Sequence, residues 1–192
     1  MNGLESHPTV ATVDQRISNV TGLFEGNSEH YYQVLRYAAT GDQFYTSHSD
    51  FIDNQVEQLC GPRLFTFFLY LQDVPEGGGG ETFFPSAQPL EDPSRKPCIS
   101  DHGHHDMKYE AILAEEVDCG LLVRPRARSA VLWPNVDLGD FSQRHRGTNH
   151  AALAVKYGCT MADGVTSCFK WAANVWIHLF DFKGAHVRGL IG

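Results

Sequence analysis

The chain has 192 residues, of which 42% are hydrophobic, and it carries a formal net charge of -8 at pH 7. A chain of this length can bury one good core, so the composition predicts a single domain over 1–192. No apolar run approaches the roughly 18 residues of a membrane span. The negative charge disfavours nucleic acid as a partner, because contacts to phosphate draw on lysine and arginine.

The first predicted element is an amphipathic helix over 12–21. Val13 and Ile17 lie one helical turn apart, and Thr12 or Asp14 is placed to cap the N-terminus. Six strand candidates follow, separated by clusters of Gly, Pro and Asp: 31–37, 64–72, 121–124, 130–133, 150–157 and 170–180. Many short strands broken by turn residues predict a mainly β fold with supporting helices, built on a double-stranded β-helix (jelly-roll) core.

Two stretches between these strands invite other interpretations. The glycine run 77–80 lacks the Gly-Lys-Ser/Thr ending of a phosphate-binding loop, so it predicts a turn that needs positive φ. The stretch 86–119 is rich in Pro, Asp, Ser and His and predicts an irregular insertion loop. It contains four potential ligands for a second metal: Cys98, His102, His104 and His105. Their spacing matches no zinc module, so solvated side chains are the preferred interpretation.

His48 and Asp50 form a pair that can reach one metal ion. In a strand, residues i and i+2 point the same way, so both side chains converge while Ser49 turns aside. We expect His150 to be the third ligand because it opens an apolar, alternating stretch, and His145 is the next candidate. Two imidazoles and one carboxylate on one face of Fe(II) leave positions open for a cosubstrate and O2. This donor set predicts a non-haem iron oxygenase.

The segments around this triad follow one another in a specific order. They are 35–37 (LRY), 45–51 (YTSHSDF), 67–74 (FFLYLQDV), 77–80 (GGGG), 81–85 (ETFFP) and 170–178 (KWAANVWIH). In that order they resemble the catalytic domain of the prolyl 4-hydroxylases, over roughly 13–183. The resemblance implies a dioxygenase that uses Fe(II), 2-oxoglutarate and O2, with ascorbate as a further cofactor. It also implies hydroxylation of peptidyl proline at C4, with release of succinate and CO2, and an N-terminally truncated domain.

The resemblance also implies a role for each matching residue. His48, Asp50 and His150 match the iron ligands. Lys170 matches the basic residue that pairs with the far carboxylate of 2-oxoglutarate, which completes the expected catalytic set. Tyr37 matches a tyrosine that lines the cosubstrate pocket. Three residues match positions near the peptide-binding or catalytic face: Arg63, Trp176 and His178.

The spacing of the lysine departs from the family pattern. Lys170 follows His150 by 20 positions, which is farther than the family spacing, and the excess lies between Cys159 and Cys168. Two cysteines around a polar stretch predict a hairpin loop linked at its neck, so that the flanking strands stay in register. Lys156 is the rival ligand because it lies nearer to the family spacing. Only Lys170 carries the downstream Trp-Ala-Ala-Asn-Val-Trp-Ile-His sequence.

The five cysteines bear on the cellular compartment. Two pairs, each flanking an apparent insertion, are plausible disulfides and leave one thiol free: Cys159 with Cys168, and Cys98 with Cys119, leaving Cys60. This pairing predicts the endoplasmic reticulum lumen or the secretory pathway. The alternative is five reduced thiols in a cytosolic protein.

Two other classes of function stay open at this point. A jelly-roll binding module without catalysis keeps the fold but needs no complete ligand set. A 2-oxoglutarate oxygenase that acts on another residue or on a small molecule keeps the same iron chemistry. Turnover of 2-oxoglutarate with and without proline-rich peptides separates these alternatives from a prolyl hydroxylase.

Overall fold

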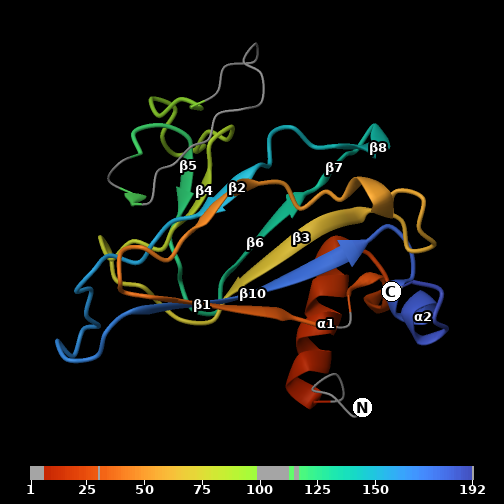
Figure 1. The fold of residues 1–192 in the computed structure, drawn as a ribbon, viewed down its shortest axis with the longest axis horizontal. Coiled ribbons are helices and arrows are strands. Elements are labelled where there is room, and N and C mark those ends of the chain that lie inside the picture. The colour runs from red at the N-terminus through yellow and green to blue at the C-terminus, as the bar shows by residue number, and fades with distance from the viewer. Residues whose placement is uncertain (1–6, 30, 99–112, 115–116, 192) are drawn as a thin grey trace.

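The computed structural model describes residues 7–29, 31–98, 113–114 and 117–191. Two four-stranded antiparallel sheets pack together, and β7 and β8 form a separate two-stranded ribbon (Figure 1). The first sheet has the order β1 (Gln33–Ala38), β10 (Phe169–His178), β3 (Arg63–Tyr70), β6 (Ala130–Pro134). The second has the order β2 (Tyr45–His48), β9 (His150–Ala152), β4 (Thr82–Phe84), β5 (Leu121–Val123). This arrangement confirms the predicted mainly β, jelly-roll fold.

The space between the sheets holds the core. Side chains of β3 alternate strictly between partly exposed and buried, as expected for a strand with one face inside. On the buried face, Phe68 and Tyr70 pack with Ala172 of β10 and with Phe84 of the opposite sheet. The same buried face carries a polar residue, Thr66, which is fully buried. This row of β3 therefore serves both the core and the site described below.

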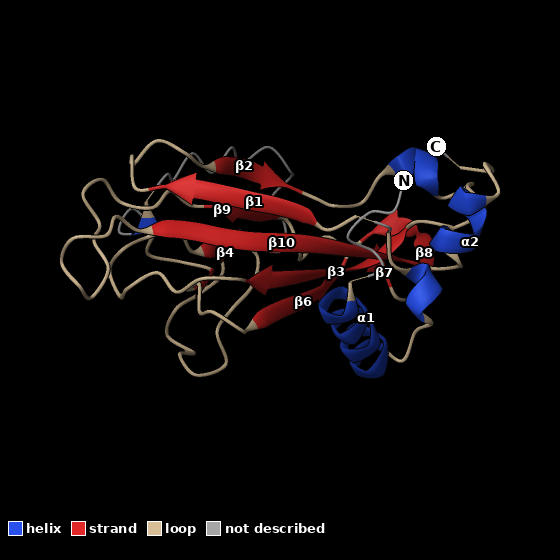
Figure 2. Ribbon diagram, turned by 90° about the horizontal axis from the view of Figure 1, so that it is seen from below, coloured by secondary structure: helices blue, strands red, loops and turns tan. Residues whose placement is uncertain are grey.

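Helix α1 (Pro8–Thr21) covers the outer face of the first sheet, where Ile17 packs against β10 (Figure 2). The helix ends at Gly22, which adopts the left-handed conformation that favours glycine. It begins four residues before the predicted range 12–21, because His7 caps it and proline occupies its first position. None of the described helices is long and apolar enough to cross a membrane.

The shorter elements lie between these strands and at the C-terminal end. They are η2 (Glu25–Asn27), η3 (Asp53–Gln55), β7 (Val136–Asp137), β8 (Asp140–Arg144) and α2 (Phe182–Val187). Helix α2 lies close to η2 (Figure 2).

The predicted strand 150–157 is shorter than expected, since β9 ends at Ala152. Ala154 and Lys156, which follow β9, form backbone hydrogen bonds with the glycine run 77–80. These bonds do not make a regular strand pair. A Cβ on Gly79 would lie 2.5 Å from the carbonyl oxygen of Ala154, and its φ of 80° is positive. The close approach of these two backbones requires glycine, which confirms the predicted positive φ in this run.

Both predicted disulfides are present. Cys98 pairs with Cys119 across the insertion, and Cys159 pairs with Cys168 at the neck of the hairpin loop. Cys60 is buried and has a free thiol. The alternative second metal site involves three histidines that lie outside the described residues: His102, His104 and His105.

Thiol counting tests the disulfides. We expect alkylation of the denatured, unreduced protein to modify Cys60 alone, and alkylation after reduction to modify all five cysteines. Mass spectrometry of the intact chain gives both numbers. Five modified cysteines without reductant, in protein made in an oxidising compartment, would contradict both pairings.

Candidate functional site

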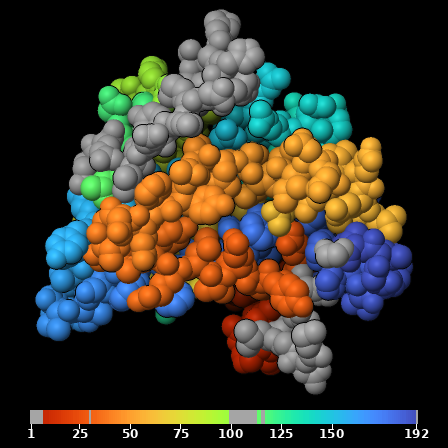
Figure 3. Space-filling view, viewed as in Figure 1, coloured from red at the N-terminus to blue at the C-terminus, as the bar shows by residue number. Residues whose placement is uncertain are grey.

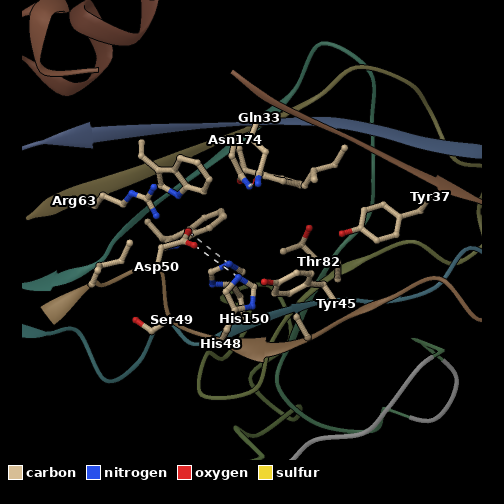
Figure 4. A pocket seen from close by; sticks show the side chains of 17 residues that line it. Gln33, Tyr37, Tyr45, His48, Ser49, Asp50, Arg63, Thr82, His150 and Asn174 are labelled. Carbon is tan, nitrogen blue, oxygen red and sulfur yellow. Dashed lines mark hydrogen bonds and ion pairs between the residues drawn. The ribbon is translucent and has the colours of Figure 1, made fainter. Parts of the chain in front are cut away.

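Strand pairing brings the three predicted metal ligands together. β2 ends at His48 and β9 begins at His150, and these two residues are partners in the antiparallel register. Asp50 lies just beyond the end of β2. One ligand atom from each side chain lies within 4.8 Å of the other two, and each histidine Nε2 is 3.7 Å from an oxygen of Asp50. Figure 4 shows the three side chains converging.

Hydrogen bonds fix which ring nitrogens are free. Nδ1 of His48 lies 2.9 Å from the carbonyl oxygen of Thr46, and Nδ1 of His150 lies 3.0 Å from that of Thr148. A carbonyl oxygen only accepts, so each Nδ1 donates and each Nε2 keeps its lone pair. Burial lowers the pKa of His150 to about 4, although the charge of Asp50 opposes this shift. Two imidazoles and one carboxylate fit the facial-triad donor set of Fe(II).

The ligands border a cavity of about 470 Å³ between the two sheets. The edge strands β1 and β2 flank the cavity and are not paired with each other. In Figure 3, part of the blue surface of β10 is visible between the orange segments that contain them. Side chains from both sheets line the cavity, among them Tyr37, Tyr45, Thr82, Trp133, Asn174 and Trp176.

Lys170 lies deep between the sheets, at one end of this cavity. Its side chain is fully buried, and Nζ donates to Oγ1 of Thr82 at 3.5 Å. The ammonium also lies 5.5 Å from the ring centre of Tyr37 and 5.9 Å from that of Tyr70. Lys170 does not itself line the cavity, whereas Thr82 and Tyr37 do. Thr82 thus separates the ammonium from the cavity by one hydrogen bond.

The rival Lys156 lies elsewhere. Its neighbours are Gly77 and Gly78, with which it lines a separate surface depression. It is only half-buried and does not border the cavity that holds the ligand cluster. The geometry therefore favours Lys170 over Lys156 as the group that meets a carboxylate in the cavity.

Arg63 and Trp176 line the other end of the cavity, away from Tyr37 (Figure 4). The guanidinium carbon of Arg63 lies 3.7 Å from the centre of the Trp176 ring, a close cation–π contact. The predicted substrate contacts of these two residues are consistent with their place in the cavity, and they stay predictions.

His178, which was expected near the peptide-binding or catalytic face, does not itself line the cavity. It is fully buried: Nδ1 donates to the carbonyl oxygen of Gly61 at 2.8 Å, and Nε2 lies 3.0 Å from Oε1 of Glu29. Oε1 of Glu29 also accepts from Nε of Arg63 at 2.8 Å. Burial acts to raise the pKa of Glu29, but the bonds from His178 and Arg63 outweigh it and lower that pKa. The register with β3 shifts between Ile177 and His178, and His178 is the partner of Arg63 across the two strands.

Several residues next to the site were not found from the sequence. They are Glu29, Thr66, Thr82 and Asn135. A hydroxyl inside the apolar run RLFTFFLY was the available signal for Thr66. His145, the alternative third ligand, lies outside the ligand cluster, and its Nδ1 accepts from the N–H of Gly147.

Comparison with known families agrees with this geometry. The model of the 2OG-Fe(II) oxygenase superfamily matches residues 32–178, which is most of the chain. The chain belongs to this superfamily. The matched range contains the metal-ligand cluster, Lys170 and the cavity between the sheets. The predicted family of Fe(II)- and 2-oxoglutarate-dependent oxygenases is therefore confirmed.

Several individual proteins similar to this chain carry the name prolyl 4-hydroxylase. Probable prolyl 4-hydroxylase 4 of Arabidopsis thaliana is 32% identical over 179 residues, covering 91% of this chain and 50% of the relative. Prolyl 4-hydroxylase subunit alpha-2 of Gallus gallus is 29% identical over 180 residues, covering 91% of this chain and 24% of the relative. The chain spans about half the length of the Arabidopsis relatives that it matches.

A solved structure supports the fold. The viral collagen prolyl hydroxylase of Paramecium Bursaria Chlorella virus-1 superposes with a TM-score of 0.54 at 21% identity, covering 90% of this chain and 70% of the viral one. At this identity the likeness supports the jelly-roll architecture.

The burial of Lys170 predicts pH-dependent binding of 2-oxoglutarate to the oxygenase. Burial lowers the pKa of its ammonium to about 7, and the carboxylate of Glu81 opposes this shift. A bound carboxylate favours the charged form, so binding takes up a proton once the free amine is neutral. The dissociation constant should then rise with pH above 7, by up to about tenfold per unit.

Equilibrium binding of 2-oxoglutarate at saturating Fe(II), without O2, measures this dependence. Lys170→Arg is the control, because a guanidinium stays charged over the whole range. Subtracting its pH profile removes the contribution of the metal ligands. Equal profiles for the two proteins from pH 7 to 9 would mean that Lys170 keeps its charge when buried.

Proposed function

We propose that this chain is the catalytic region of a prolyl 4-hydroxylase, which hydroxylates peptidyl proline at C4 and converts 2-oxoglutarate to succinate and CO2. The observation that carries the proposal is the His-Asp-His cluster beside a buried lysine in a superfamily oxygenase. The relatives named prolyl 4-hydroxylases, each matching about nine tenths of this chain, favour proline over other targets. The chain spans about half the length of the Arabidopsis relatives, so we extend this activity to the whole protein only as a proposal.

Three side chains supply the ligand atoms for the metal. His48, Asp50 and His150 would hold Fe(II) through two free Nε2 atoms and one carboxylate. Bound Fe(II) supplies the redox chemistry that couples oxidation of 2-oxoglutarate by O2 to hydroxylation of the substrate. The carbonyl oxygens of Thr46 and Thr148 orient both imidazoles and leave each Nε2 available to the metal. Ascorbate as a further cofactor rests on the family resemblance.

The end of the cavity near Lys170 suits the far carboxylate of 2-oxoglutarate. The hydroxyl of Thr82, which lines the cavity and accepts from the ammonium of Lys170, can donate to that carboxylate, the charge of the ammonium attracts it from behind Thr82, and the Tyr37 ring forms an apolar wall. A charge-assisted hydrogen bond is worth roughly 1.5–3 kcal/mol, enough to select a dicarboxylate over a monocarboxylate. These residues therefore bind and orient the cosubstrate and exclude water from its far end.

The opposite end of the cavity suits the peptide. Arg63 and Trp176 present a stacked guanidinium and indole, and Glu29 with His178 holds the arginine in place. Proline rings pack well on aromatic faces, and an extended peptide offers carbonyl oxygens to a guanidinium. We infer a proline-containing peptide here, with His178 acting through Arg63.

We also infer that the protein works in an oxidising compartment such as the endoplasmic reticulum lumen. Four of the five cysteines are paired, and disulfides persist in secretory compartments but are rare in the cytosol. Localisation of the tagged full-length protein tests this inference.

Substrate-dependent turnover tests the function. We expect succinate to form from 2-oxoglutarate with Fe(II), faster with a proline-rich peptide than with the same peptide carrying alanine for proline. Mass spectrometry should find one added oxygen on proline. Turnover that no peptide stimulates would favour a small-molecule oxygenase, and a complete lack of turnover would favour a binding module.

The ligand assignment has its own test. His150→Ala should abolish iron binding and peptide hydroxylation, because the alanine side chain has no atom that can bind the metal. His145→Ala is the matched control and should keep both, since its ring lies outside the cluster. The bound iron and the succinate formed are measured. Full activity of His150→Ala would transfer the third ligand to another residue.

The two lysines are separated by kinetics. Lys170→Ala should raise the apparent KM for 2-oxoglutarate by about 10- to 100-fold, because the far carboxylate is left desolvated and unpaired. Lys156→Ala, which loses the same charge outside the cavity, should leave that KM nearly unchanged. Succinate formation against 2-oxoglutarate concentration gives both values. A large shift in Lys156→Ala alone would reverse the assignment.

A further inference from the structure

A buried pair of polar side chains lies directly behind Asp50. Thr66 on β3 is fully buried and Asn135, just after β6, is 1% exposed. Oγ1 of Thr66 donates to Oδ2 of Asp50 at 2.6 Å, and Nδ2 of Asn135 donates to Oγ1 of Thr66 at 2.9 Å. Burying two polar side chains costs free energy unless their polar atoms form hydrogen bonds. Here the hydrogen bonds run from Asn135 through Thr66 to the metal ligand Asp50.

The single hydroxyl proton of Thr66 has two acceptors within reach. Oδ2 of Asp50 is the nearer at 2.6 Å, and Oδ1 of Asn135 is at 3.3 Å. Nδ2 of Asn135 donates to Oγ1 of Thr66 and so occupies one lone pair of that hydroxyl oxygen. The hydroxyl proton of Thr66 is therefore directed toward the carboxylate of Asp50. The bond to an ionised acceptor is also the stronger of the two. Asn135 therefore orients Thr66, and Thr66 holds one oxygen of Asp50.

The same short segment also supports a second ligand. The carbonyl oxygen of Pro134 accepts from Oγ1 of Thr148 at 2.7 Å, and the carbonyl oxygen of Thr148 accepts from Nδ1 of His150. The backbone of Asn135 is itself anchored, since its N–H donates to the carbonyl oxygen of Leu64. Two chains of hydrogen bonds thus start at Pro134–Asn135 and end on two different metal ligands.

We propose that Thr66 and Asn135 are positioning residues that set the metal affinity of the site by fixing the carboxylate of Asp50. This inference rests on the proposed metal site and goes beyond it. With Oδ2 held by Thr66, the carboxylate loses its freedom to rotate, and Oδ1 is the oxygen left without a protein donor among the described bonds. A ligand that is already ordered loses less entropy on binding.

Metal binding without cosubstrate or peptide tests the proposal. Co(II) is the probe, because it is stable in air and its visible absorption reports the ligand arrangement. Thr66→Val removes the hydroxyl at nearly constant shape and should raise the dissociation constant for Co(II) by about 10- to 100-fold. Thr66→Ser keeps the hydroxyl and should stay within about threefold of the wild type. Asn135→Ala should fall between them, because Thr66 can still donate but is no longer oriented.

The absorption spectrum at saturating Co(II) distinguishes positioning from general loosening. In Thr66→Val the carboxylate is free to present both oxygens, so the spectrum should change, and in Thr66→Ser it should not. Thr21→Val is the control for the loss of a threonine hydroxyl, since Oγ1 of Thr21 donates to the carbonyl oxygen of Ile17 in α1, away from the cavity. It should bind Co(II) like the wild type with an unchanged spectrum.

The outcomes separate failure of the positioning role from failure of the proposed metal site. A folded Thr66→Val protein with the affinity and spectrum of the wild type would overturn the positioning role. If Thr66→Val does not fold, Thr66→Ala undergoes the same two measurements and decides instead. If the wild type does not bind Co(II), or His150→Ala binds it equally well, the proposed metal site fails, independently of Thr66.

Discussion

The antiparallel pairing of β2 with β9 is the interaction on which the whole site depends. It sets His48 opposite His150, two residues that are far apart along the chain. Both strands are short, so their own bonds fix the register weakly, and a slip by one residue would turn a ligand away from the cavity. β9 is held on its other side by β4, and the chain beyond it by the glycine run 77–80. The close backbone approach at Gly79 thus helps to hold the chain that follows His150.

The two ends of the cavity differ in how their buried charges are compensated, and this decides which end receives an anion. The guanidinium of Arg63 is already paired with Glu29, whose carboxylate His178 also contacts. Lys170 instead has the neutral hydroxyl of Thr82 as its hydrogen-bond partner among the described residues, with the charge of Glu81 nearby. A buried ammonium with a neutral partner gains most from a carboxylate ligand. This difference supports the proposal that the dicarboxylate binds at the Lys170 end.

Local patterns in the sequence predicted much of this structure. The spacing of His48 and Asp50 and the cysteine pairs around two insertions act over short distances, and the structure contains both. The alternation predicted from His150 to Tyr157 is not present, since β9 ends at Ala152. Contacts between distant segments were not predictable. Thr66 and Asn135 are 69 positions apart, and no local pattern predicts their hydrogen bond. The contacts of His178 with Gly61 and Glu29 likewise join segments 117 and 149 positions apart, and no local pattern predicts them.

The extra residues before Lys170 are tolerated because the pairing of β10 with β1 and β3, and not the chain length from His150, positions the lysine. The buried row of β3 reaches both ends of the site: Thr66 bonds to Asp50, and the hydroxyl of Tyr70 bonds to Thr82, which receives the ammonium. Four residues along a strand span about 13 Å, so β3 sets the separation between the two anchored ends. β10 pairs with β1 from Phe169 to Asn174 and with β3 from Ala172 to His178, so an insertion outside the paired region does not alter that separation. The loop closed by Cys159 and Cys168 lies outside it.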